Sequence, residues 1–163
     1  MRRARVDDVE QILALIRELA DYEREPDAVR ATPDDLRRDG FGPDPAFEAL
    51  LAEVEGEGVV GLALYFGNYS TWEGRRGIYL EDLYVRPAAR RRGVGRALLA
   101  ALAAEVRRRG GARLDLSVLD WNQPARDVYA ALGFEHKHDW RPYRLEGAAL
   151  ERLAAEGGAR GPS

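Results

Sequence analysis

The chain has 163 residues, with 28 acidic and 25 basic side chains, a net charge of −3 and no cysteine. This length predicts a single domain over 1–155, and the tail over 156–163 is expected to be disordered. The lack of cysteine excludes disulfides, thiolate metal sites and cysteine nucleophiles, and it fits a cytoplasmic location. No apolar run reaches the length of a membrane span, and the negative charge argues against a nucleic-acid partner.

Two helices are predicted in the first quarter of the chain. The first covers 7–22, where apolar residues recur at helical spacing and Asp7 forms a predicted capping box with Glu10. The second covers 32–39, because Thr32 is a favoured cap residue and a proline follows it at the first helical position.

The middle of the chain predicts an antiparallel meander. Three segments rich in β-branched and aromatic residues are separated by a glycine turn and a polar connection, and a bulge is expected at Gly61. The three predicted strands cover 47–54, 59–69 and 78–85.

Helices and strands alternate in the remaining part of the chain. We expect a helix that begins near Gly95 and ends at Gly110, a strand over 114–119, a helix over 123–132 capped by Asn122, a strand pair over 134–138 and 140–145, and a helix over 147–155. This element order predicts an α/β (α+β) fold, in which helices pack on a mixed sheet.

The sharpest local pattern is a run of arginines and glycines after the third strand. Arg90, Arg91 and Arg92 precede Gly93 and Gly95, and the next helix begins directly behind them. Glycine lets the backbone approach a ligand closely, and a helix N-terminus presents free N–H groups, so the turn predicts a phosphate or pyrophosphate site. An ordinary glycine turn with solvated arginines would explain the same residues.

Two further clusters contain side chains that could take part in catalysis. Glu81 and Asp82 lie in an apolar strand, where neighbouring residues face opposite sides, so at least one carboxylate faces the covered side or a cleft. A salt bridge would satisfy such a carboxylate equally well. Tyr129 lies about two helical turns after Asn122, and by itself fits core packing. The two histidines of the chain are too few for a closed metal site, so no metal is predicted.

These motifs occur together and in a fixed order. The run Tyr79-Leu80-Glu81-Asp82-Leu83-Tyr84-Val85, then Arg90-x-x-Gly93-x-Gly95, then Trp121-Asn122-x-Pro124-Ala125 with Tyr129 resembles the GNAT superfamily of N-acetyltransferases, whose pyrophosphate signature is Arg-x-x-Gly-x-Gly. The segment Glu18-Leu19-Ala20-x-Tyr22-Glu23 is similar to the diamine (spermidine/spermine) acetyltransferase branch. The segments Tyr69-Ser70-Thr71-Trp72 and Asp120-Trp121-Asn122-Gln123 resemble its thialysine N-epsilon-acetyltransferase subgroup.

The resemblance implies a fold, a reaction and a set of site residues. The fold would be a twisted, mostly antiparallel sheet with helices on both faces and a splayed parallel strand pair that binds acetyl-CoA. A homodimer would transfer acetyl directly to a small cationic amine, with Tyr129 protonating the leaving thiolate and Glu81 assisting amine deprotonation. The amine side would be lined by Tyr22, Glu23, Glu81 and Asp82. Contacts to acetyl-CoA would come from Leu83, Tyr84, Val85, Arg90, Arg91, Arg92, Gly93, Val94, Gly95, Arg96, Asn122, Gln123, Pro124 and Ala125.

One departure from the family pattern and two rival functions accompany this interpretation. The family has a glutamate before a Gly-Trp pair, whereas here His138 and Asp139 precede Trp140, and Asp139 is a candidate to replace the missing charge. The acceptor could instead be a protein N-terminus or an amino-bearing drug. A non-catalytic acyl-CoA-binding regulatory domain is the other alternative, although Glu81 and Tyr129 favour an enzyme.

Overall fold

The computed structural model describes residues 1–158, which divide into two compact units, one over 1–117 and one that begins at Val118. The first unit contains the sheet together with helices α1 (Val9–Tyr22), α2 (Pro33–Phe41) and α3 (Val94–Arg108). The second contains helices α4 (Gln123–Ala131) and α5 (Gly147–Gly158). Along residues 1–158, no helix is both long and apolar enough to cross a membrane.

Helix α1 follows a 3-10 turn at Val6–Asp8. The predicted capping box of Asp7 and Glu10 is wrong. Asp8 instead accepts two hydrogen bonds from the Arg2 guanidinium, at 2.6 and 2.8 Å, and this contact holds the pKa of its carboxyl below the usual range. Asp8 also accepts a hydrogen bond from the Arg5 N–H at 2.7 Å. The start of the helix is therefore fixed by a local contact one residue away from the predicted position and by a charged partner outside the helix.

Helix α2 begins as predicted. The Thr32 hydroxyl oxygen accepts a hydrogen bond from the Asp35 N–H at 3.2 Å, and an Asp35 carboxylate oxygen accepts one from the Thr32 N–H at 3.0 Å. This reciprocal pair satisfies two donors that a helix start otherwise leaves without partners. The helix was expected to end before Gly40, but it includes this glycine and ends at Phe41.

The sheet is mixed and mostly antiparallel, which confirms the predicted fold class. Its strands lie in sequence order, and every neighbouring pair is antiparallel except β4 and β5, which are parallel. The strands are β1 (Arg2–Arg3), β2 (Glu48–Val54), β3 (Gly58–Ser70), β4 (Arg75–Val85) and β5 (Arg113–Leu116).

The strands differ from the predicted ones at their ends and at their irregularities. The hairpin of β3 and β4 is tighter than expected, so β4 begins at Arg75, whereas β5 is shorter and ends at Leu116. The bulge expected at Gly61 lies one residue earlier, where Val60 has no partner between the pairs of Gly61 and Val59 with β2. A second bulge, in β4, was not predicted and lies in the candidate site.

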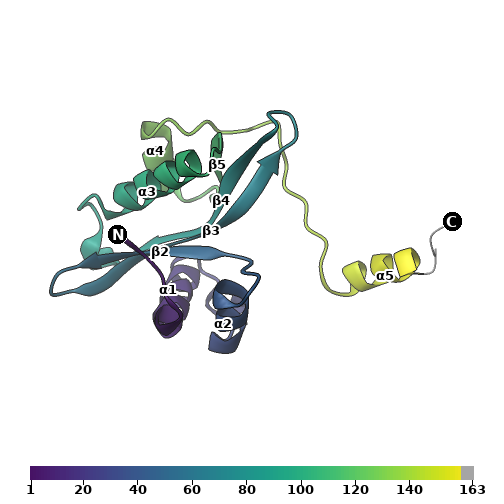
Figure 1. The fold of residues 1–163 in the computed structure, drawn as a ribbon, viewed down its shortest axis with the longest axis horizontal. Coiled ribbons are helices and arrows are strands. Elements are labelled where there is room, and N and C mark those ends of the chain that lie inside the picture. The colour runs from purple at the N-terminus through teal and green to yellow at the C-terminus, as the bar shows by residue number, and fades with distance from the viewer. Residues whose placement is uncertain (159–163) are drawn as a thin grey trace. The chain divides into compact units, whose positions relative to one another are not determined.

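Helices cover both faces of the sheet in the first unit (Figure 1), as the resemblance implied. On one face, α1 and α2 bury an apolar cluster against β2, β3 and β4, and α3 packs against the same strands from the other side. The fully buried members include Ile12, Leu15, Leu51 and Leu62. Burial of each such side chain contributes about 1.5–3 kcal/mol, so this layer gives the sheet a firm support.

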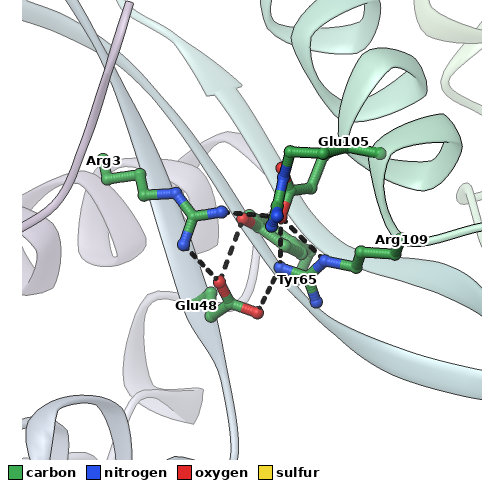
Figure 2. A network of polar contacts seen from close by, with 6 residues as sticks. Arg3, Glu48, Tyr65, Glu105 and Arg109 are labelled. Carbon is green, nitrogen blue, oxygen red and sulfur yellow. Dashed lines mark hydrogen bonds and ion pairs between the residues drawn. The ribbon is translucent and has the colours of Figure 1, made fainter.

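A polar network joins β1, β2, β3 and α3 at one end of the sheet (Figure 2). Glu48 binds Arg109 at 2.6 Å and Arg3 at 3.1 Å, and Glu105 binds both arginines at 2.6 Å. The guanidinium groups keep the pKa of the Glu105 carboxyl well below its usual range, whereas burial raises the pKa of the neighbouring Tyr65 to about 12. Every charged member of the network has an opposite charge beside it, so we assign it a structural role.

The second unit differs from the prediction in two elements. Helix α5 is longer than expected, and the two strands expected over 134–145 do not form. Helix α5 continues three residues beyond the predicted 147–155, so 156–158 are helical, and 159–163 lie outside the described residues. The predicted strand pair over 134–145 is wrong: within 1–158, no strand pairs with this segment. Trp140 and Tyr143 are exposed, Tyr143 at 93%, and a strand without a hydrogen-bonding neighbour is not a stable element.

Candidate active site

Strand β4 leads from the parallel pair to the arginine–glycine loop. Its pairing with β5 runs from Gly77 to Leu80 and ends there, whereas its pairing with β3 continues to Val85. Within the first unit, the segment Glu81–Val85 therefore lies beyond the parallel ladder. One backbone edge of this segment is not covered by β5, so its N–H and C=O groups on that side are available to an extended ligand, apart from the Val85 carbonyl oxygen, which accepts a hydrogen bond from Arg90.

The two adjacent carboxylates of β4 lie in different environments because of a bulge. Leu64 and Tyr65 of β3 pair with Asp82 and Leu80, so Glu81 is the extra residue, and its side chain is exposed. Asp82 is partly buried and lies two residues from Tyr84, which belongs to the apolar cluster beneath α1. Because alternate residues of a strand share a face, Asp82 is the carboxylate on the face that α1 covers.

Asp82 also lies in an unfavourable electrostatic environment. Burial, reinforced by the negative charges of Glu81 and Glu23, raises the pKa of its carboxyl from 3.8 to about 6. Glu23 follows the last residue of α1, and burial raises the pKa of its carboxyl as well. The first unit thus brings together the three predicted acidic residues of the amine side. A bound cation would favour their charged forms, because opposite charge offsets the cost of desolvation.

The loop after β4 has the backbone of an anion-binding turn. Gly93 caps α3 with φ 79°, and Arg91 also has a positive φ of 60°. Gly93 is left-handed and is followed directly by the helical Val94, and a left-handed residue next to a right-handed one points successive N–H groups into a concave turn. The free N–H groups of the helix start lie behind it. Gly95 leaves space in front of them, since a Cβ there would meet only Val85, at 3.8 Å.

The arginine side chains of this loop have different partners. Arg92 pairs with Glu57 at 2.8 Å. Arg90 donates a hydrogen bond from Nε to the Val85 carbonyl oxygen at 2.9 Å, and its guanidinium lies over the ring of Tyr22. Arg91 and Arg96 are exposed and have no ion pair among the described residues. Both are therefore available to an anionic ligand, whereas Arg90 and Arg92 are already engaged.

In the second unit, the predicted cofactor segment forms the start of α4. Asn122 is buried and caps the helix, accepting a hydrogen bond from the Ala125 N–H at 3.3 Å, with Pro124 in the first turn. Arg126 donates to the Asp120 carbonyl oxygen at 2.8 Å and so braces the turn before the helix. The cap and the helix that follows are as the sequence predicts.

Tyr129 lies on α4 of the second unit and is partly buried. Its ring lies 5.5 Å from that of Phe134 between centroids, tilted by 58°, and its carbonyl oxygen accepts a hydrogen bond from the Phe134 N–H at 3.0 Å. This packing restricts the orientation of the phenol. Asp139, the other predicted residue of this unit, is exposed beside His138, with 3.4 Å between the carboxylate and the imidazole nitrogen.

Sequence patterns missed one contact close to the acidic residues. Arg86, directly after β4, binds both carboxylate oxygens of Glu18 on α1, at 2.7 to 3.1 Å. Glu18 belongs to the recognised N-terminal motif, but its partner lies 68 residues away along the chain. The only signal was that Glu18 and Tyr22 are four residues apart and so share one face of the helix.

The part of the chain that the structure describes contains no cluster of potential metal ligands. Across 1–158, no group of three or more histidine, aspartate or glutamate side chains is arranged to hold a metal ion.

Comparison with known proteins identifies the class. The family model of the acetyltransferase (GNAT) family matches residues 10–134, and the chain belongs to this family; it is an acetyltransferase. Among curated relatives, thialysine N-epsilon-acetyltransferase of Bos taurus is 42% identical over 166 residues, covering 96% of this chain and 97% of that protein. Spermidine/spermine N(1)-acetyltransferase-like protein 1 of Homo sapiens is 35% identical and covers 96% of this chain but 24% of that protein.

A solved structure supports the fold. An integron cassette protein from the mobile metagenome of V. cholerae superposes with a TM-score of 0.78 at 26% identity, covering 94% of this chain and 95% of that one. The resemblance to the GNAT superfamily, inferred from sequence motifs, is confirmed by the family model and the curated relatives.

Proposed function

We propose that this acetyltransferase transfers the acetyl group of acetyl-CoA to a primary amine of a small, cationic acceptor, with thialysine or a similar lysine-like compound as the preferred acceptor. One observation carries the proposal: β4 bears the carboxylates of Glu81 and Asp82, and the loop that follows it forms the turn capped by Gly93. A single strand thus connects a cation-attracting side to an anion-binding turn. The acceptor amine is the cation of the substrate pair, and the pyrophosphate of acetyl-CoA is the anion.

Acetyl-CoA would be held mainly by backbone groups. The open edge of Leu83–Val85 fits an extended amide chain, and the turn over Arg91–Arg96 fits a pyrophosphate, with the exposed guanidinium groups adding positive charge. The start of α4, from Asn122 to Ala125, offers a second helix N-terminus. Acetyl-CoA supplies the activated acetyl group as a thioester; the protein has to orient it and move protons.

The first chemical task is to deprotonate the acceptor. An alkylammonium has a pKa near 10.4, so only about 0.04% is neutral at pH 7, and loss of its proton costs about 4–5 kcal/mol. Glu81 takes this proton, directly or through one water, while Asp82 and Glu23 hold the remaining positive charge of the acceptor. A backbone N–H near Leu83 polarises the thioester carbonyl that the amine attacks.

The second task is to protonate the leaving group. As the amine nitrogen bonds to the carbonyl carbon, the carbon–sulfur bond breaks and the thiolate sulfur takes the hydroxyl proton of Tyr129. The nitrogen loses its second proton as the amide forms, and that proton restores the tyrosine. The reaction needs no covalent enzyme intermediate, which agrees with a chain that has no cysteine.

The acidic side also indicates which amines are preferred. Three carboxylates raise the local concentration of a cation, and an acceptor with more than one charge places an ammonium beside each partner once water is removed. The preference for thialysine over a polyamine is drawn from the sequence relatives, among which the bovine protein carries that name.

The test compares kcat/KM for thialysine, lysine, ornithine, spermidine and spermine, measured as acetyl-CoA-dependent release of free thiol. We expect thialysine to have the highest kcat/KM and all acceptors to require acetyl-CoA. A clear advantage for spermine would overturn the choice of acceptor but leave the transfer reaction intact. A chain that binds coenzyme A and acetylates none of the amines would instead be a regulatory domain.

Glu81→Gln isolates the proton acceptor, because the change keeps the size of the side chain and removes its basicity. We expect kcat to fall by roughly 10²–10⁴-fold, with the affinity for coenzyme A retained. The exposed Glu25→Gln, just beyond α1, is the matched control and should leave kcat unchanged. A Glu81→Gln enzyme with normal kcat would assign the proton transfer to another group.

Assembly and location remain predictions of the family resemblance. We expect a homodimer, which light scattering at micromolar concentration tests, and a cytoplasmic location, which microscopy of a tagged protein tests.

A further inference from the structure

Arg90 is the first residue of the Arg-x-x-Gly-x-Gly signature, yet its side chain contacts protein groups on the α1 side of β4. Its Cζ atom lies 4.8 Å from the centroid of the Tyr22 ring and 5.7 Å from that of Tyr84. Its Nε donates to the Val85 carbonyl oxygen at 2.9 Å, which fixes the plane of the guanidinium. A cation within about 6 Å of an aromatic face is attracted by the ring electrons, so both tyrosine rings attract the Arg90 guanidinium.

A second contact joins the same two segments one helical turn earlier. Arg86 binds Glu18 through both carboxylate oxygens and also donates to the Val59 carbonyl oxygen at 3.0 Å. Glu18 and Tyr22 are four residues apart on α1, as Arg86 and Arg90 are in the connection between β4 and α3. The two arginines therefore contact one face of the last turns of α1. The last of these contacts is to Tyr22, the residue before Glu23.

These contacts link the cofactor loop to the amine side. The Arg90 guanidinium lies near the ring of Tyr22, which directly precedes Glu23. It also lies near the ring of Tyr84, which shares a strand face with Asp82 two residues away. The charge of Glu23 also contributes to the raised pKa of the Asp82 carboxyl. The position of the end of α1 therefore sets the distance between the carboxylates of Glu23 and Asp82. A side chain that fixes Tyr22 also fixes Glu23.

We propose that Arg90 is a positioning residue for the acceptor amine: its guanidinium, stacked on Tyr22 and supported by the Arg86–Glu18 pair, holds the end of α1 beside Asp82, and the backbone of the loop rather than this side chain binds the pyrophosphate. This proposal rests on the proposed function. It gives the signature arginine a task on the acceptor side of the site, and it assigns the anionic ligand to the exposed Arg91 and Arg96.

Arg90→Lys separates the two roles, because lysine keeps the positive charge but loses the planar group that stacks on a ring. We expect the KM for the amine to rise roughly two- to ten-fold, the size of one partly exposed cation–π contact, while the calorimetric affinity for coenzyme A stays unchanged. Arg38→Lys, an exposed arginine whose partners Asp35 and Asp39 both lie on α2, is the matched control and should alter neither quantity.

The partner ring is tested by repeating Arg90→Lys in two backgrounds. In Tyr22→Phe the ring is retained, so the rise in the amine KM should persist. In Tyr22→Leu the ring is absent, so Arg90→Lys should have no further effect on that KM. This non-additivity is the signature of a direct contact. Melting temperatures of all variants, measured in parallel, establish that each is folded under the assay conditions.

The outcomes distinguish this inference from the function on which it rests. If Arg90→Lys weakens coenzyme A binding and leaves the amine KM unchanged, the side chain is a phosphate ligand and the proposal is overturned. An equal effect in the Tyr22→Leu background overturns it as well. If the unmodified protein acetylates no amine at all, the proposed function fails, and the positioning role fails with it.

Discussion

Replacement of Asp82 by asparagine should make the protein more stable and a weaker binder of its acceptor. The raised pKa of the Asp82 carboxyl, about 6 against an ordinary 3.8, means that the folded state holds this charge at a cost. That difference corresponds to at most about 3 kcal/mol at pH values above 6. Asparagine keeps the shape of the side chain and removes the charge, so most of this cost should disappear.

The sign of the pH dependence follows from the direction of the shift. Below pH 3.8 the carboxyl is protonated in both the folded and the unfolded state, and the substitution changes little. Between 3.8 and 6 the unfolded state loses its proton first, so the cost of the charge to the folded protein grows as the pH rises. Above pH 6 the cost is complete. Asp82→Asn should therefore raise the free energy of unfolding at pH 7.5 and much less at pH 4.5.

Urea denaturation at the two pH values measures this difference. At pH 7.5 we expect a gain of about 1–3 kcal/mol, which for a chain of this size raises the melting temperature by several degrees. Asp44→Asn, an exposed aspartate between α2 and β2, is the matched control. Equal stability of Asp82→Asn and the unmodified protein at pH 7.5, or a gain of the same size at pH 4.5, would refute the electrostatic account of Asp82. The amine KM should rise in the same variant, because a carboxylate is lost from the cation side.

Three further substitutions test separate parts of the account. Tyr129→Phe removes only a proton donor, so kcat should fall by roughly 10²–10⁴-fold while coenzyme A binding persists; unchanged turnover would restore a packing role. Gly95→Val places a branched side chain in front of the loop N–H groups, so calorimetry should find coenzyme A binding weakened more than amine binding, and full affinity would mean that the loop does not hold phosphate. Thr32→Ala removes the cap of α2 and should lower the free energy of unfolding by about 1 kcal/mol in urea, with normal kcat; a larger loss would indicate a role beyond the cap.

Features that depend on neighbouring residues along the chain were predictable from the sequence. The cap at Thr32 and the cap at Asn122 each place a side-chain oxygen within three residues of the donor it binds, so a short motif contains both partners. The turn at Gly93 follows in the same way from glycines ahead of an apolar helix. Family motifs added the acidic residues, which the first unit brings together at Asp82.

Features that depend on pairing between distant segments were not predictable. The bulge at Glu81 exists because β3 and β4 shift their register by one residue, and a single strand sequence contains no record of its partner's register. The same limit explains the wrong strand pair over 134–145, where a suitable composition has no neighbouring strand among the described residues. Arg86 and Glu18 are likewise 68 residues apart.

The most direct test of the central claim is the fate of a labelled acetyl group. The protein is incubated with thialysine and acetyl-CoA whose acetyl carbons are ¹³C, and the acceptor is analysed by mass spectrometry. We predict one labelled acetyl group per thialysine, attached to the side-chain amine, together with an equal amount of free coenzyme A. Release of coenzyme A without a labelled amine would mean hydrolysis, and no release with any amine of the panel would mean a binding domain; either result would contradict the account.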